Sequence, residues 1–168
     1  MAMNNLHREA TEMLCRVSLL HRYRISLALT GLKIYRGQPQ ILDYLLAHGD
    51  CSQKELAEHL GVSPASIATS LKRMNKAGFI EKAPDENDKR INRLKITPKG
   101  MEALDKGKKE CGKVDESMFT GFNESEISAF TQMLGRIRNN LSFDGINEKD
   151  AIKFINTADN NRNGDDKK

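Results

Sequence analysis

One stretch of the sequence, residues 64–77, combines residue types that bind nucleic acids. At about 100° per residue, helical geometry places its three basic residues and three small residues on a common side. These residues are Ala65, Ser66, Thr69, Lys72, Arg73 and Lys76. An Arg side chain binds guanine or phosphate through its planar fork, a Lys binds phosphates, and small residues let a helix approach base edges closely. Residues 64–77 are therefore a candidate helix for the major groove of double-stranded DNA. Taken alone, Lys72 and Arg73 are also explained as ordinary solvated charges.

The other side of this predicted helix is apolar. Four residues fall within about 40° of one another and predict a buried stripe: Ile67, Leu71, Met74 and Gly78. Ser63 and Pro64 are typical of the N-cap and the first helical position, and both are candidate DNA contacts because they begin the helix. Ser66 has an alternative interpretation, as a residue that only helps to start the helix.

A shorter helix is predicted immediately before this one. Residues 52–55, Ser-Gln-Lys-Glu, match a capping box, in which the hydroxyl of Ser52 and the carboxylate of Glu55 each accept a hydrogen bond from the other residue's backbone amide. This helix should end at Leu60, because Gly61 permits a left-handed turn. Two short helices joined in this way predict a helix-turn-helix, whose first helix lies across the DNA backbone with Ser52 and Gln53 as candidate contacts.

A β-hairpin is predicted next along the chain. Residues 79–83 are typical of a short strand, residues 84–90 are polar and turn-rich, and residues 94–96 alternate as a returning strand. A charged hairpin directly after a helix-turn-helix is the layout of a winged helix. The hairpin, or wing, would then reach a minor groove beside the recognition helix.

In this region the sequence resembles the MarR family of bacterial transcriptional regulators. The matching segments are residues 52–57, 62–67, 71–80, 85, 88–90 and 96–100, within a resemblance that covers about residues 37–104. The resemblance implies a homodimer that binds a palindromic DNA operator, as a repressor. It also implies wing contacts from Asp88, Lys89 and Arg90, in which Arg90 enters the minor groove and Asp88 holds it in place. Asp88 is also compatible with an ordinary turn.

Patterning and resemblance together predict the domain organisation. Residues 1–36 and 120–157 are assigned to a helical dimerisation region, and residues 37–119 to the DNA-binding lobe with its connecting helix. Residues 158–168 are almost wholly polar and are predicted to be a disordered tail. The predicted fold class is mainly α (α+β), a winged helix-turn-helix with long N- and C-terminal dimerisation helices and one small β-hairpin wing.

The composition agrees with this class of protein. The chain has 168 residues, enough for about one domain, and its 38% hydrophobic and 30% charged residues are typical of a helical protein with much solvated surface. Its net charge of +4 permits binding to phosphate backbones without requiring it. No apolar run approaches the roughly 18 residues of a membrane span, and the N-terminal residues do not resemble a secretory signal. We therefore predict no membrane partner and a cytoplasmic location.

The resemblance also implies a signal. A small phenolic or aromatic effector would bind between the dimerisation helices and the DNA-binding lobe and release the protein from DNA. The candidate pocket residues are Arg16, Leu20, Tyr23 and Tyr35, and core packing explains each of them equally well. One branch of the family senses organic hydroperoxides through a cysteine in the first helix, which makes Cys15 a candidate redox sensor. Cys15 is also explained as a small buried hydrophobic residue.

Other classes of function have less support in the sequence. No GxSxG, P-loop or Rossmann glycine pattern is present, so neither catalytic residues nor an enzyme activity is predicted. The four His and three Cys form no tight cluster, and neither a metal site nor a cofactor is predicted. A helical protein-docking module without DNA affinity is the remaining alternative.

Overall fold

The computed structural model describes residues 5–35, 37–85, 89, 92–142 and 150–152. Its longer helices and its strands are α1 (Asn5–Thr30), α2 (Gln38–His48), β1 (Cys51–Ser52), α3 (Gln53–Leu60), α4 (Pro64–Ala77), β2 (Ile80–Pro84), β3 (Asn92–Ile96), α5 (Pro98–Met118) and α6 (Glu124–Leu141). The predicted mainly helical winged fold is confirmed. The predicted tail, and the parts of the predicted dimerisation region in residues 1–4, 36, 143–149 and 153–157, lie outside the described residues.

The helices begin where local sequence signals predict them. The Ser52 hydroxyl accepts a hydrogen bond from the Glu55 amide at 3.2 Å, and the Glu55 carboxylate accepts one from the Ser52 amide at 2.6 Å. The predicted capping box is therefore confirmed. Gly61 follows α3 with a left-handed φ of 61°, and its amide donates to carbonyl oxygens of the last turn, which ends the helix.

The small sheet joins the wing to the start of α3. Its strand order is β1-β3-β2, and both pairs are antiparallel. The hairpin strands match the predicted ones to within about two residues. Strand β1 was not predicted, because a strand of two residues is too short to show an alternating pattern. Because β1 leads directly into α3, the central strand β3 connects the wing to the helix-turn-helix.

The hydrophobic core lies in the lobe formed by α2, α3, α4 and the sheet. Its largest fully buried side chains are Ile34, Ile41, Leu42, Leu45, Leu56, Leu71, Met74, Ile80 and Leu94. Ile67, Leu71 and Met74 of the predicted stripe on α4 are buried in this core, as the helical spacing predicts. These buried side chains therefore anchor α4 to the core, and the opposite side of the helix faces outward.

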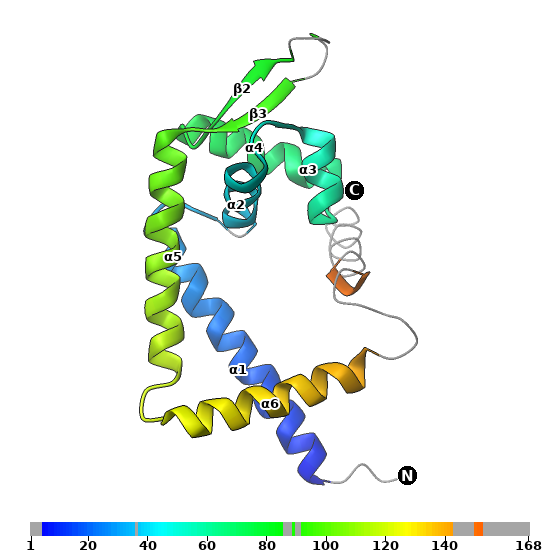
Figure 1. Ribbon diagram of the computed structural model, residues 1–168, viewed down its shortest axis with the longest axis vertical. Coiled ribbons are helices and arrows are strands. Elements are labelled where there is room, and N and C mark those ends of the chain that lie inside the picture. The colour runs from blue at the N-terminus through cyan, green and yellow to red at the C-terminus, as the bar shows by residue number, and fades with distance from the viewer. Residues whose placement is uncertain (1–4, 36, 86–88, 90–91, 143–149, 153–168) are drawn as a thin grey trace, which may run out of the picture.

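The remaining helices form a frame that extends from the lobe (Figure 1), and Leu29 of α1 and Leu104 of α5 belong to the core of the lobe. Helix α5 runs from the wing to the far end of the molecule, α1 packs against α5, and α6 crosses the far end. Among their described residues, α1 buries only Leu29, and α6 buries none. Within the described ranges, none of the helices combines the length and the apolar character of a membrane span.

Candidate nucleic-acid interface

The first turn of α4 is fixed by its cap. The Ser63 hydroxyl accepts a hydrogen bond from the Ser66 amide at 3.2 Å and lies 3.0 Å from the Ser66 hydroxyl. Pro64 occupies the first helical turn and needs no amide partner there. These contacts leave Ser66 half-buried and Pro64 exposed. The cap thus presents the N-terminal end of α4, with its positive dipole, to the outside.

The outward side of α4 carries the predicted contact residues. All five of the side chains Ala65, Thr69, Lys72, Arg73 and Lys76 are exposed. The Thr69 hydroxyl donates to the Ala65 carbonyl oxygen at 3.1 Å, so the Thr69 methyl group and the hydroxyl lone pairs remain for an outside partner. The exposure of Thr69 and Arg73 is a requirement of the predicted role in DNA binding.

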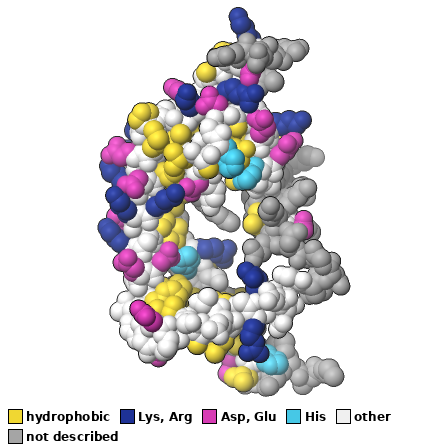
Figure 2. All heavy atoms as spheres, viewed as in Figure 1, with side chains coloured by type: hydrophobic (Ala, Val, Ile, Leu, Met, Phe, Trp, Pro, Cys, Tyr) yellow, Lys and Arg dark blue, Asp and Glu magenta, His cyan; other side chains and the backbone are white. Residues whose placement is uncertain are grey.

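The charges of α4 differ from those of α5. Among the described residues, Lys72, Arg73 and Lys76 form no ion pair, whereas four lysines of α5 do. The pairs are Lys106–Glu102, Lys108–Asp43, Lys109–Asp105 and Lys113–Glu110, at N···O distances of 2.6–2.9 Å. Figure 2 shows basic and acidic side chains alternating along α5. The positive charge of α4 is therefore uncompensated within the described chain, whereas that of α5 is largely neutralised locally.

The C-terminal end of α4 is held by residues at the start of α5. Gly78 ends the helix with a left-handed φ of 76°. The Thr97 hydroxyl donates to the Gly78 carbonyl oxygen at 2.7 Å, and the Lys99 ammonium donates to the Ala77 carbonyl oxygen at 2.7 Å. At Gly100 there is no room for a side chain, because a Cβ atom would overlap the Phe79 carbonyl oxygen. This close junction fixes the C-terminal end of the outward-facing helix relative to the core.

Helix α3 braces the recognition helix. Its first residue, Gln53, donates from Nε2 to the Pro64 carbonyl oxygen at 3.5 Å. Ser52 and Gln53, the predicted backbone contacts, are half-buried, and the Ser52 hydroxyl already accepts a bond in the capping box. The structure therefore gives both residues a part in holding α3 and α4, and their proposed contact with DNA is additional to it.

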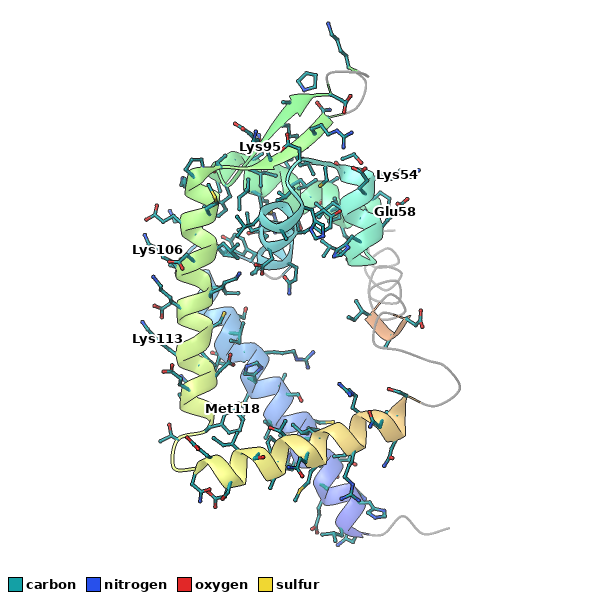
Figure 3. The ribbon with its side chains drawn as sticks, in the orientation of Figure 1. Lys54, Glu58, Lys95, Lys106, Lys113 and Met118 are labelled. Carbon is teal, nitrogen blue, oxygen red and sulfur yellow. The ribbon has the colours of Figure 1, made fainter. Side chains whose placement is uncertain are left out.

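The structure describes the two strands of the wing and, in the loop between them, Asp85 and Lys89. Lys89 is exposed, and Lys95 is exposed on β3 close to the base of the hairpin (Figure 3). The other two predicted wing contacts, Asp88 and Arg90, lie outside the described residues. The described strands place the wing beside α3 and α4, as a winged helix requires.

A polar cluster near the loop end of the wing strands was not predicted from the sequence. Arg93 of β3 donates from Nε to Asp85 at 2.5 Å, and its Nη1 lies 3.3 Å from Glu55 Oε2. Hydrogen bonds from Ser52, followed by the Arg93 charge, lower the pKa of the Glu55 carboxyl, and the bond to Asp85 raises the pKa of Arg93. The sequence shows an Arg after the charged turn, but it does not show which carboxylates this Arg meets. The pairing of Arg93 with Ser52 in the sheet brings Arg93 to the start of α3 and so to Glu55.

The predicted effector residues are exposed in the single chain. Arg16 lies with Cys15 on an open groove along α1 and pairs with Glu12 at 3.9 Å. Leu20 and Tyr23 lie further along α1, and Tyr35 lies between α1 and α2, all with more than a third of their surface exposed. The described chain alone therefore does not bury these residues.

The three cysteines have different surroundings. Cys15 is exposed, Cys111 is partly buried and Cys51 is buried. Burial raises the pKa of the Cys51 thiol to about 11 and also raises that of Cys111. In the part of the chain that the structure describes, no group of three or more His, Cys, Asp or Glu side chains could hold a metal ion.

The fold and this surface define a winged helix-turn-helix protein with an outward basic recognition helix. Comparison with known proteins agrees, since the MarR family model matches residues 29–91. The HTH-type transcriptional regulator YybA of Bacillus subtilis (strain 168) is 31% identical over 113 residues, which cover 67% of this chain and 75% of YybA. The chain belongs to the MarR family, and it is a DNA-binding transcriptional regulator and not an enzyme.

Further comparisons agree with the winged helix-turn-helix fold. The HTH-type transcriptional repressor IacR of Pseudomonas putida is 24% identical over 102 residues, which cover 61% of each chain. The solved structure of YusO from Bacillus subtilis has the same fold, with a TM-score of 0.72, 15% identity and coverage of 82% of this chain and 97% of YusO. The S. aureus MepR F27L mutant bound to an oligodeoxyribonucleotide gives a TM-score of 0.62 at 18% identity, with coverage of 79% and 97%.

Proposed function

We propose that the protein is a homodimeric repressor that binds an approximately palindromic operator and is released by a small aromatic or phenolic effector. The observation that carries the proposal is the outward side of α4, where three exposed basic side chains have no ion-pair partner among the described residues. Fourteen residues make a helix of about 21 Å, long enough to cross the major groove.

The contacts with DNA are divided among residues of the recognition helix, of α3 and of the wing. We propose that Arg73 binds a guanine or a phosphate, and that Lys72 and Lys76 bind phosphates. The N-terminal residues Ser63 to Ser66, together with Thr69, approach base edges and phosphates, and Ser52 and Gln53 contact the backbone from α3. In the wing, Lys89 and Arg90 contact the neighbouring minor groove, with Arg90 inserted and held in place by Asp88.

The homodimer is supported by the uncovered apolar side chains of the frame. Helix α6 exposes Phe130, Met133, Ile137 and Leu141, and α1 exposes Leu6, Met13, Leu19, Leu20 and Tyr23. Figure 2 shows hydrophobic side chains open to view over α6. Contiguous exposed apolar side chains of this kind mark association surfaces, and a second copy offers the same two helices in return. A two-fold dimer would present its two recognition helices about 34 Å apart, which accounts for a palindromic operator.

The repressor and effector parts of the proposal are supported by relatives. IacR is named a repressor, and the organohalide-sensing regulator RdhR, which has this fold, was solved with bound 2,4-dichlorophenol. An effector between α1 and the lobe would contact Arg16, Leu20, Tyr23 and Tyr35. It must bind one arrangement of the recognition helices more tightly than the other, and a coupling of about 1–3 kcal/mol is enough.

Footprinting on the DNA upstream of the protein's own gene tests the proposal. We expect protection of two half-sites whose centres are about one helical turn apart. Fluorescence anisotropy on the protected duplex then compares Arg73→Ala with Lys113→Ala. Both changes remove one positive charge, but Lys113 pairs with Glu110 on the distal half of α5 (Figure 3).

The two variants should differ clearly. Arg73→Ala should weaken binding by about 1–3 kcal/mol, and Lys113→Ala should bind as the wild type does. Loss of preference at one base position would assign Arg73 to a guanine, and a uniform loss would assign it to a phosphate. Equal affinities for wild type and Arg73→Ala would exclude α4 as the recognition helix.

The effector is identified by testing which small molecules release the protein from the same duplex. Aromatic acids and phenols are expected to release the wild type and Cys15→Ser alike. Release by an organic hydroperoxide that is lost in Cys15→Ser would instead assign the protein to thiol sensing.

A further inference from the structure

We propose that Arg93 is a positioning residue that holds the wing strands β2 and β3 in one orientation relative to the recognition helix, by binding Asp85 and Glu55 at the same time. The inference rests on the proposed DNA contacts of α4 and the wing. It concerns the angle between two DNA-binding elements, and Arg93 itself is not assigned a contact with DNA.

The backbone alone connects the wing weakly to α3. Arg93 lies in the central strand, opposite Ser52 on one side and Ala83 on the other. The pairing on the Ser52 side involves only the two residues of β1. Such a short ladder leaves side chains to complete the connection between the loop end of the hairpin and α3, and Arg93 lies at this point.

The Arg93 side chain supplies this restraint from its planar fork. Nε donates to Asp85, directly after β2, and Nη1 reaches Glu55 in the first turn of α3. The Asp85 side chain is only 10% exposed, so its charge requires compensation within the protein. Lysine has a single ammonium group on a flexible stem and lacks the fixed fork that binds two carboxylates with this geometry.

The connection continues from α3 to the recognition helix. The Glu55 carboxylate that meets Arg93 also accepts the Ser52 amide. The neighbouring Gln53 donates to the carbonyl oxygen of Pro64, the first residue of α4. A path of polar contacts therefore joins the end of β2 to the first turn of the helix that carries the DNA contacts.

The charge of Arg93 is already balanced by two carboxylates. Its role is thereby distinguishable from a phosphate contact, because replacement by lysine keeps the charge and removes only the fork. Glu55→Gln is the complementary change, since glutamine keeps the capping box but loses the charge. A matched control is Glu58→Gln, which removes a carboxylate from the same helix where it pairs only loosely with Lys54, at 3.9 Å (Figure 3).

The experiment measures the affinity of the full-length protein for the duplex defined by the footprint. Arg93→Lys and Glu55→Gln should each weaken binding about three- to tenfold, as expected for loss of a short ion pair network. Glu55→Gln removes a negative charge, which by itself would strengthen binding to DNA, so a loss has a positional cause. Glu58→Gln should bind at least as tightly as the wild type.

A double-mutant cycle tests whether the two residues act together. The variant with both Arg93→Lys and Glu55→Gln should bind no more weakly than either single variant. Multiplying losses would overturn the proposal. So would wild-type affinity in Arg93→Lys, because charge alone would then be sufficient.

Amide hydrogen exchange of the free protein tests the restraint of the wing in the absence of DNA. Arg93→Lys should speed exchange in β2 and β3 while leaving α5 unchanged, and unchanged exchange in β2 and β3 would overturn the proposal. If the wild type protects no DNA in the footprint, the proposed operator binding is wrong. The exchange result would still decide whether Arg93 restrains the wing.

Discussion

Replacing Gly100 with alanine tests the junction that holds α4 against α5. A Cβ atom at this position would overlap the carbonyl oxygen of Phe79 and lie 2.9 Å from Cγ1 of Ile96. A carbon and a carbonyl oxygen in contact lie about 3.3 Å apart, so the backbone near Phe79 must move by roughly 1 Å. That carbonyl also accepts the Thr97 amide at 3.1 Å, and the movement disturbs this bond.

The expected magnitude follows from two costs and one gain. Overpacking costs about 1–3 kcal/mol and a disturbed buried backbone bond about 1–3 kcal/mol, while alanine gains about 1 kcal/mol over glycine in a helix. We expect Gly100→Ala to lower the free energy of unfolding by about 3 kcal/mol. Since domains are stable by only about 5–15 kcal/mol, such a loss is easily measured.

The same helix provides its own controls. A Cβ at Gly112 would meet no atom within 4 Å, so Gly112→Ala should raise the free energy of unfolding by about 0.5–1 kcal/mol. At Gly107 a Cβ would lie 3.3 Å from Cδ2 of Leu29, and the gain and the cost should nearly cancel. Urea unfolding at one fixed protomer concentration gives all three values. A Gly100→Ala midpoint equal to that of the wild type would refute this account of the junction. Lower stability of Gly112→Ala than of the wild type would refute the open surroundings assigned to the control.

Three further outcomes are expected. Ser63→Ala removes the N-cap of α4 and should cost about 1 kcal/mol in urea unfolding, and an unchanged midpoint would show that Pro64 alone is enough to begin the helix. Because the Glu55 pKa is lowered in the folded state, its stabilising contribution is present above its ordinary pKa and is lost as the pH falls through the folded pKa. The wild type should therefore lose stability more steeply than Glu55→Gln between about pH 5 and pH 3, and parallel curves would contradict the assignment. Cys51, whose pKa is raised to about 11, should react with iodoacetamide at pH 8 only when the lobe opens, and rapid labelling at this residue in the folded protein would contradict its burial.

The elements that depend on local chemistry were predictable. The caps at Ser52 and Ser63 and the left-handed turn at Gly61 involve residues within four positions of one another, and the structure has all three. The same holds for the buried stripe of α4, since helical periodicity alone separates Ile67 and Leu71 from the exposed Arg73. Residues that recur at short spacing carry this information in the sequence itself.

Features that depend on long-range register were not predictable. Strand β1 exists only because Cys51 and Ser52 meet Leu94 and Arg93, more than forty positions away. For the same reason the ion pair of Arg93 with Glu55 could not be foreseen, because many carboxylates lie at comparable distances along the sequence. The exposure of Tyr23 and the other effector candidates likewise depends on how α1 packs against α5.

The bare surface of α6 has a consequence for how occupancy of DNA responds to the amount of protein in the cell. Among the described residues, this helix of 18 residues buries no side chain, so it has little to stabilise it in water. In the proposed homodimer, association supplies that stabilisation, so assembly and ordering of this end of the molecule become a single step. At low abundance the number of DNA-competent molecules then rises with the square of the protomer concentration, and modest changes in synthesis produce a sharpened transcriptional response.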